Sequence, residues 1–278
     1  MGRLALAGRP LSGDHGRVDQ AATLALLEQG DLAPQALRLG GMARAEGVVI
    51  VSERFWAFAG TDGSLREGTM PTAPNSLRSI PLVRGLVRLS ASLSPLFRRQ
   101  GVARRRERIF LLAAIVAPLA LAFAPSWIGL IAGLATTVAL LGWLLRGRTL
   151  YLHGAEHRAI AAAEEGQLGA TWDDERHPSR FSLRCGTNFV ALVLPITLLA
   201  DRLWPFAPAL WTPVVLAMLS LGLTMELWRV VQSSTGSMRI FLYPGLGLQR
   251  LTTREPTIDE TRLALTAVAS VLRRELDA

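Results

Sequence analysis

A long charge-free run in the middle of the chain restricts the fold more than any other feature. Residues 109–145 contain no charged side chain. A helix rises about 1.5 Å per residue, so a run of this length can cross a hydrocarbon layer of about 30 Å twice. Pro125 and Ser126 lie near its middle and favour a break there. The run therefore predicts a transmembrane hairpin with helices at about 109–124 and 127–145.

A second apolar block predicts a second hairpin. It starts at Cys185, is interrupted by Asp201 and Arg202, and ends near Met225. Backbone polar groups in lipid must be hydrogen-bonded within the segment, so helices at about 187–200 and 208–228 are expected. Half of the 278 residues are apolar, which favours a membrane protein. The expected fold class is mainly α, a polytopic membrane protein with four transmembrane helices in two hairpins.

The distribution of arginine predicts the orientation of these helices. The turns within the two hairpins contain only Arg202, whereas basic residues gather before the first hairpin and between the two: Arg98, Arg99, Arg104, Arg105, Arg106, Arg108, Arg146, Arg148, Arg158, Arg176, Arg180 and Arg184. Basic residues near span ends stay on the cytoplasmic side. We therefore expect a multi-pass protein of the cell (inner) membrane with both termini cytoplasmic. Residues 1–10 lack the apolar core of a cleavable signal peptide, so the first span is expected to target the chain.

The net charge of +8 favours a lipid surface over nucleic acid as the partner. All 30 basic residues are arginine, and their clusters flank the apolar runs. Anionic lipid attracts such clusters by about 1 kcal/mol per residue, so a nucleic-acid partner is not needed to explain them. The expected partners are the lipid bilayer and a membrane-associated substrate, and the sequence is compatible with an oligomer.

The segments outside the apolar runs are expected to fold on the cytoplasmic side. The β-branched residues 48–51, the aromatic-rich residues 55–58 and the turn signal Asp62-Gly63 predict a small β-hairpin. Apolar triplets alternate with arginines after Pro81, which favours an interfacial helix. The expected organisation is an N-terminal extension with a short helix (1–38), the β-hairpin and interfacial helix (39–108), the first transmembrane hairpin (109–145), a cytoplasmic loop (146–186), the second transmembrane hairpin (187–228) and a C-terminal segment with a helix from about Ile258 to Leu276 (229–278).

The segment YLHGAEHRAI contains the candidate site. On a helix, His153 and His157 project from one face, which allows two imidazoles to bind one ion. The pattern His-x-x-Glu-His matches the inverted zincin motif, in which the glutamate, here Glu156, is the general base. Cys185 would add a thiolate and leave one coordination position open. The alternative is that these residues are polar contacts between helices.

Two further residues are weaker candidates for metal ligands. His177 could be a fourth donor, although a loop histidine beside a proline is more often only solvated. Glu226 lies near the end of the last expected span, where a carboxylate is costly without a partner. A role in the site, an ion pair with Arg229 and exposure at the interface remain open for Glu226.

Several separate blocks resemble one known family. These are HGAEHR (153–158), SRFSLRCGTNF (179–189), GLGLQRLTTREP (245–256), GGMARAEGVVI (40–50) and PLVRGLV (81–87), in the same order as in the family. Between about Leu39 and Leu272 the chain resembles the YqhQ-like family of membrane proteins, a domain-of-unknown-function family described as predicted metal-dependent enzymes. The resemblance implies a metal-dependent activity whose reaction is not established.

The resemblance carries over block by block, with one departure. The family's His-Gly-Ala-Glu-His block falls on residues 153–157, and its Arg-Cys-Gly-Thr block falls on residues 184–187. Family members read His-Pro before this Arg-Cys, whereas this chain has Ser182-Leu183, and its nearest His-Pro is His177-Pro178. The resemblance therefore implies that His177 substitutes for the missing histidine, or that the site is weakened.

Two functions follow from these residues. The first is a membrane-embedded metal-dependent enzyme, most simply a zinc hydrolase, with Glu156 as the catalytic base and a divalent metal as cofactor. The second is a non-catalytic membrane assembly factor or scaffold, in which the same polar block holds the 146–186 loop against the helices. A transporter is disfavoured, because the charged residues lie at the ends of the expected spans and give no polar path across the membrane.

Overall fold

The computed structural model describes residues 19–32, 38–98, 101–121, 147–207, 209–233 and 236–278, with single positions and pairs between 128 and 142. The strands are β1 (Gly40–Arg44), β2 (Gly47–Val51), β3 (Phe55–Gly60) and β4 (Leu65–Thr69). The helices are α1 (Gln20–Asp31), α2 (Asn75–Ser79), α3 (Val83–Phe97), α4 (Arg105–Leu121), α6 (Thr149–Glu165), α7 (Leu168–Trp172), α8 (Gly186–Arg202), α9 (Thr212–Ser233), the 3-10 helix η1 (Ser237–Leu242), α10 (Tyr243–Thr252) and α11 (Ile258–Leu276). The chain is thus mainly helical with a small N-terminal sheet.

The four strands form an antiparallel sheet in the order β1-β2-β3-β4. The expected hairpin is its central pair, β2 and β3, in which Val48 pairs with Ala59 and Ile50 pairs with Ala57. These four residues face one core, whereas Val49 points to the opposite face and packs with aromatic side chains. Because successive side chains of a strand point to opposite faces, the unbroken apolar run of β2 fits a strand that is covered on both sides.

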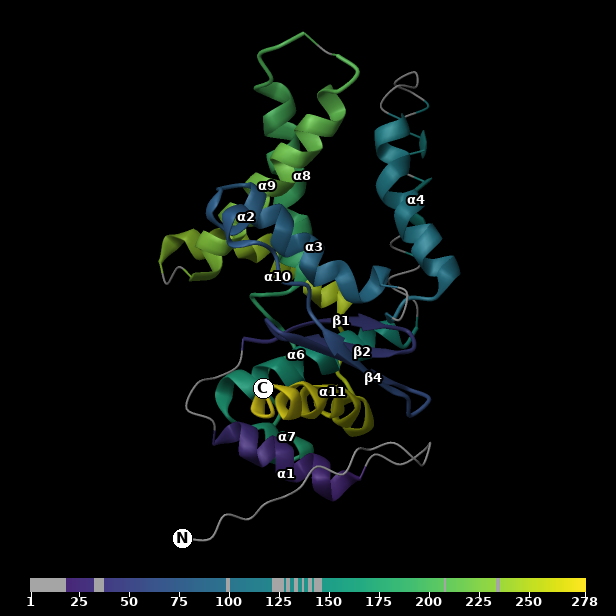
Figure 1. Ribbon diagram of the computed structural model, residues 1–278, viewed down its shortest axis with the longest axis vertical. Helices are drawn as coiled ribbons and strands as arrows, with labels where there is room; N and C mark the ends of the chain where they lie inside the picture. Colours follow the sequence, from purple (N-terminus) through teal and green to yellow (C-terminus); the bar gives the residue numbers. More distant parts are fainter. Residues whose placement is uncertain are drawn as a thin grey trace.

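Helices α6 and α11 cover one face of the sheet (Figure 1). Small residues of α6, Ala155 and Ala159, are fully buried there and allow the helix to lie close to the strands. Helix α11 begins with a capping box, in which the Thr257 side chain accepts from the Glu260 backbone and the Glu260 side chain accepts from the Thr257 backbone. The C-terminal helix therefore occupies the residues expected for it and belongs to the core that supports α6.

The other helices extend away from this core. Figure 1 shows α4, α8 and α9 rising on the side of the sheet opposite α11 and α1. Helices α8 and α9 pack against each other, and α3 packs against α9. Many large apolar side chains of this pair and its connecting turn are exposed: Val190, Leu194, Leu198, Leu199, Leu203, Phe206, Leu210, Trp211, Val214, Met218 and Leu223. An exposed apolar surface of this size is typical of contact with a membrane or another protein.

The prediction of four transmembrane helices is wrong. In the described part of the chain, one helix, Thr212–Gln232, is long and apolar enough to cross a membrane. Helix α8 has 17 residues, so it is about 25 Å long, and it ends at Arg202. The first turn of α4 consists of charged residues, which shortens its apolar part below the length of a span. The helix expected at 127–145 lies mostly outside the described residues. One candidate span indicates membrane association, and a multi-pass topology is not supported.

The packing of the two ends of the chain restricts how α9 can contact a membrane. The sheet precedes α9 and α11 follows it, yet both belong to one core. A crossing by α9 alone would place the sheet and α11 on opposite sides of the bilayer and separate that core. Helix α9 by itself therefore cannot carry the chain across the membrane. The expected cytoplasmic location of both termini was based on four spans, and the structure does not support that number.

Candidate metal centre

Helix α6 brings the two histidines of the motif side by side. His153 and His157 lie one turn apart, and their ring centroids are 4.4 Å apart. His157 is almost fully buried, and His153 is half-buried. Helix α6 lies close to the segment that follows α10, because a Cβ atom on Gly154 would be 2.1 Å from the backbone oxygen of Arg254. The glycine of the motif therefore allows the contact that places α10 beside the histidines.

Backbone carbonyls fix the orientation of both imidazoles. His153 Nδ1 lies 2.9 Å from the carbonyl oxygen of Thr252, and His157 Nδ1 lies 2.6 Å from that of Arg180. A carbonyl oxygen only accepts hydrogen bonds, so each Nδ1 carries the proton and donates it. Each Nε2 then keeps its lone pair. This is the tautomer in which histidine binds metal through Nε2, with its second nitrogen held by the surrounding protein.

Cys185 completes a group of three converging donors. Its Sγ lies 3.3 Å from His153 Nε2, and the ligand atoms of the two histidines and Cys185 lie within 4.8 Å of one another. Cys185 is the N-cap of α8, and its Sγ accepts hydrogen bonds from the backbone and side chain of Thr187 at 3.4 and 3.2 Å. The end of a helix thus holds the thiol in place.

The protonation states of these groups suit a metal. Burial lowers the pKa of His157 to about 3 and also lowers that of His153, so both imidazoles are neutral at physiological pH. Burial, with a further contribution from nearby Glu156, raises the pKa of Cys185 to about 11. A bound cation would displace this thiol proton.

His157 Nε2 is buried and has no hydrogen-bond partner among the described residues. A buried nitrogen without a partner is costly, and a bond to a metal ion would remove this cost. Two imidazoles and a thiolate fit zinc.

Glu156 lies beside this group and is not one of the three converging donors. Its side chain packs against β1, where a Cβ atom on Gly41 would be 2.8 Å from its Cγ. Burial raises the pKa of Glu156 to about 8, and a hydrogen bond from the backbone of Ala43 opposes part of this rise. Its Oε2 is buried without a partner in the described part of the chain. A carboxyl group with this pKa can take up or release a proton near neutral pH.

The two weaker candidates lie elsewhere. His177 is exposed, and its Nδ1 lies 3.6 Å from Asp174. Glu226 lies on α9 and binds Arg84 at 2.6 Å and Arg229 at 3.2 Å, so the ion pair with Arg229 is present. Neither residue belongs to the group formed by the two histidines and Cys185.

Residues without a predicted role support the loop before Cys185. Gln249 is fully buried, accepts from the backbone N–H of Ser182 at 2.9 Å and donates to its carbonyl at 2.7 Å. The Ser182 hydroxyl accepts from the backbone of Arg184 and takes no part in the donor group. The motif that contains Gln249 stood out in the sequence, but nothing in its spacing indicated that it braces residues 182–188.

An ion-pair network holds the carbonyl that orients His157. Arg158 is buried, and its guanidinium pairs with Glu255 and donates to the Pro178 carbonyl at 3.3 Å. Glu255 also pairs with Arg180 at 3.4 Å. The carbonyl of Arg180 is the one that accepts from His157, so this network connects α6, the loop before Cys185 and the segment after α10 around one imidazole.

We expect Gly154→Ala to destabilise the protein by about 1–3 kcal/mol, because the new methyl group must push the Arg254 backbone away from α6. Thr252, which orients His153, lies two residues before Arg254 and should move with it. Gly247→Ala is the matched control, because that helical glycine has open space around it. Alanine there should stabilise α10 by up to about 1 kcal/mol. Chemical denaturation of the three proteins measures both effects, and equal behaviour of the two variants would contradict the close contact.

Comparison with known proteins agrees with the resemblance of the motif blocks. A family described as "Protein of unknown function (DUF1385)" matches residues 112–274, which is more than half of the chain. The "Uncharacterized protein YqhQ" of Bacillus subtilis (strain 168) is 31% identical over 134 residues, covering 46% of this chain and 42% of that protein. The chain thus matches less than half the length of this relative. No solved structure matches the chain. The family match includes α6, Cys185 and most of α11, and the chain therefore belongs to the DUF1385 family of proteins of unknown function.

Proposed function

We propose that this chain is a membrane-associated metalloenzyme, most simply a zinc hydrolase, with His153, His157 and Cys185 as metal ligands and Glu156 as general base. The observation that supports it best is the orphaned Nε2 of His157. A buried nitrogen with a free lone pair, beside a second imidazole and a thiol, is costly in a protein without a ligand for it. Three protein ligands leave one position open, as is typical of catalytic zinc sites.

The chain's own residues would bind and orient the ion and manage the proton. The Thr252 and Arg180 carbonyls hold the imidazoles in the ligating tautomer. A bound zinc ion would supply Lewis acidity that polarises the bond to be cleaved. Glu156 would remove a proton from the attacking water, since its pKa of about 8 lies close to neutral pH.

The exposed apolar surface of α8 and α9 supports a location at a membrane. In this proposal the exposed apolar surface of the two helices lies against the lipid, and the ends of both helices stay on the side of the sheet, which keeps the core intact. Aromatic rings gather at the turn between them. The ring centroid of Trp204 lies 5.4 Å from that of Phe206 and 5.9 Å from that of Trp211. Cys185 lies at the base of this hairpin, so the substrate would approach from the membrane surface.

The burial of the site favours a second candidate. Glu156, His157 and Cys185 are all buried, as in structural metal sites, and such a site would suit a non-catalytic assembly factor or scaffold. The two functions differ in whether Glu156 is needed once the metal is bound.

Metal removal tests the proposed function. We expect the purified protein to hydrolyse activated esters such as p-nitrophenyl acetate or p-nitrophenyl phosphate, to lose this activity with a chelator, and to regain it with zinc. The protein carrying both His153→Ala and His157→Ala is the control for hydrolysis by contaminants. Activity that survives in this variant, or that zinc does not restore, would contradict the proposed chemistry.

A further inference from the structure

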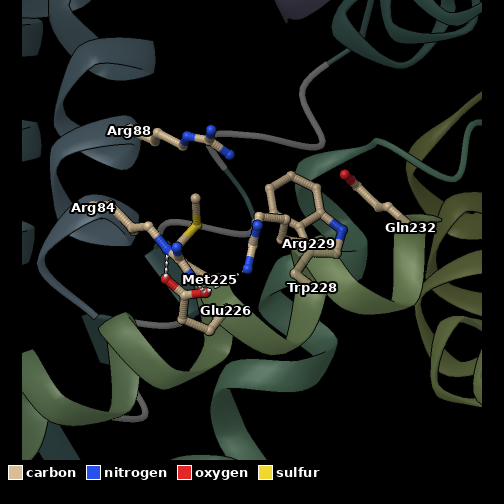
Figure 2. Close-up of a pocket in the computed structure, with 8 residues that line it drawn as sticks. Arg84, Arg88, Met225, Glu226, Trp228, Arg229 and Gln232 are labelled. Atoms are coloured by element: carbon tan, nitrogen blue, oxygen red, sulfur yellow. Dashed lines mark hydrogen bonds and ion pairs between the residues drawn. The ribbon is translucent and has the colours of Figure 1, made fainter. Parts of the chain in front are cut away.

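A second polar site lies between α3 and α9, away from the metal ligands. A cavity of about 190 Å³ is lined by Arg84, Gly85, Arg88, Met225, Glu226, Trp228, Arg229 and Gln232 (Figure 2). Two glycines bring the helices together: a Cβ atom on Gly85 would be 2.6 Å from Met225 Cβ, and one on Gly222 would be 3.1 Å from Leu82 Cβ. The close packing of α3 and α9 therefore builds the walls of this cavity.

The cavity carries a net positive charge. Figure 2 shows the side chains of Arg84, Arg88 and Arg229 around one space. Glu226 neutralises part of this charge, because it pairs with Arg84 at 2.6 Å and with Arg229 at 3.2 Å. Arg88 is exposed and forms no ion pair with any of the described residues. Three guanidinium groups and one carboxylate leave two positive charges, which is enough to bind a phosphate group.

The indole ring of Trp228 forms part of the wall of the same cavity. The Nε1 atom of Trp228 is buried and has no acceptor within the described residues. The ring is held by Phe189 of α8, at a centroid distance of 5.8 Å, so the indole is fixed in position. Figure 2 shows this nitrogen on the side of the ring toward Gln232, away from the three guanidinium groups, so the ring of Trp228 lines the cavity as a wall. Gln232 adds a neutral donor to the same wall.

The position of the cavity indicates where such a ligand comes from. It lies near the C-terminal end of the candidate membrane helix, Thr212–Gln232. Helix α3 has an apolar stripe and carries arginines, as helices that lie at a lipid surface do. At this depth arginines meet the phosphates of lipid headgroups, and guanidinium groups bind phosphate through paired hydrogen bonds.

We propose that the cavity between α3 and α9 binds a phosphate ester, the headgroup phosphate of an anionic lipid, through Arg88 and Arg229. Arg84 and Glu226 position the site, because their ion pair joins the two helices. Free phosphate shares this chemistry and is the other source of the ligand. The proposal does not depend on the metal centre and holds or fails independently of it.

Binding of defined probes to the full chain in nonionic detergent tests this site. The probes are dihexanoyl phosphatidylglycerol, inorganic phosphate and, as a zwitterionic control, dihexanoyl phosphatidylcholine. We expect phosphatidylglycerol to bind most tightly and Arg88→Gln to weaken its binding by about tenfold, the usual effect of losing one charge-assisted hydrogen bond. Trp228→Phe keeps an aromatic wall and removes an N–H that faces away from the arginines, so it should change binding by less than about threefold.

Arg106→Gln is the matched control, because Arg106 is an exposed arginine of α4 outside the cavity and its loss changes the net charge equally. It should change binding by less than about twofold. Equal weakening by Arg88→Gln and Arg106→Gln would show attraction by net charge only and overturn the site. Failure of phosphatidylglycerol and inorganic phosphate to bind would also overturn it. Tighter binding of inorganic phosphate, sensitive to Arg88→Gln, would overturn the lipid as the source of the phosphate.

Discussion

Replacing His157 by alanine is expected to weaken zinc binding by more than about 100-fold. Loss of a group that merely orients a ligand costs about 10- to 100-fold, and loss of the ligand itself should cost more. His157 is the residue to change first, because its Nε2 is the buried nitrogen without a partner. Competition with a chromogenic chelator measures the affinity of the wild type and the variant under the same conditions.

His177→Ala is the matched control for this experiment. It removes a histidine that is close in the sequence but exposed and outside the donor group. Its zinc affinity should equal that of the wild type. His157 is fully buried, so His153→Ala, which removes a half-buried ring, provides a second variant in case the first does not fold. Equal zinc affinity in the His153, His157 and His177 variants would contradict the assigned ligands.

The Glu156→Gln variant should keep its metal and lose about 10²- to 10⁴-fold in hydrolytic rate, the usual contribution of a general base. Glutamine preserves the size and burial of the side chain and removes its ability to take up a proton. Glu67→Gln provides a control carboxylate, because Glu67 lies on β4 and pairs with Arg273 and Ser270 of α11. Unchanged activity in a zinc-loaded Glu156→Gln protein would favour the structural metal site of a scaffold.

The same variant has an effect on stability that needs no substrate. Burial raises the pKa of Glu156 from 4.5 to about 8, so the folded metal-free protein binds this proton more tightly than the unfolded chain does. The free energy of unfolding therefore falls as pH rises between these two values, by about 1.4 kcal/mol per pH unit. Glu156→Gln should remove this fall. Denaturation at about pH 6.5 and about pH 8 measures it, and an unchanged pH dependence in the variant would contradict the raised pKa.

The parts of the fold that could be predicted from the sequence carry local signals. The sequence of the C-terminal helix shows acidic residues at its start, arginines near its end and a threonine before it. In α11 these residues form the first turn, the last turn and the N-cap. The strands β2 and β3 follow from β-branched and aromatic runs beside a turn. The histidine pair follows from helical spacing, because both rings must lie on one face.

The prediction of four spans was wrong because hydropathy measures the composition of a segment and not its position relative to a membrane. An apolar helix reads the same in sequence whether it spans a bilayer or rises from a folded core, as α8 does. The length of α8 decides against the predicted topology, and this length is a property of the folded chain.

The surroundings of the candidate site could not be predicted for a different reason. Thr252 and Arg180 act through backbone carbonyls, which every residue has, so no residue type marks the role. Gln249 contacts Ser182 across 67 positions of sequence, a separation that no helix or strand periodicity can reveal. The sequence predicted that Cys185 lies near the two histidines because the three side chains can bind one metal ion. The distances between their ligand atoms could be known only from the folded chain.

Metal content is the measurement that tests the central claim most directly. The wild-type chain and the protein with both His153→Ala and His157→Ala would be purified in detergent without chelators, reloaded with zinc, desalted and analysed for metal. The account predicts close to one zinc per wild-type chain and almost none in the variant, with both proteins folded by circular dichroism. No zinc in the wild type after reloading, or equal zinc in both proteins, would contradict a metal centre formed by these residues.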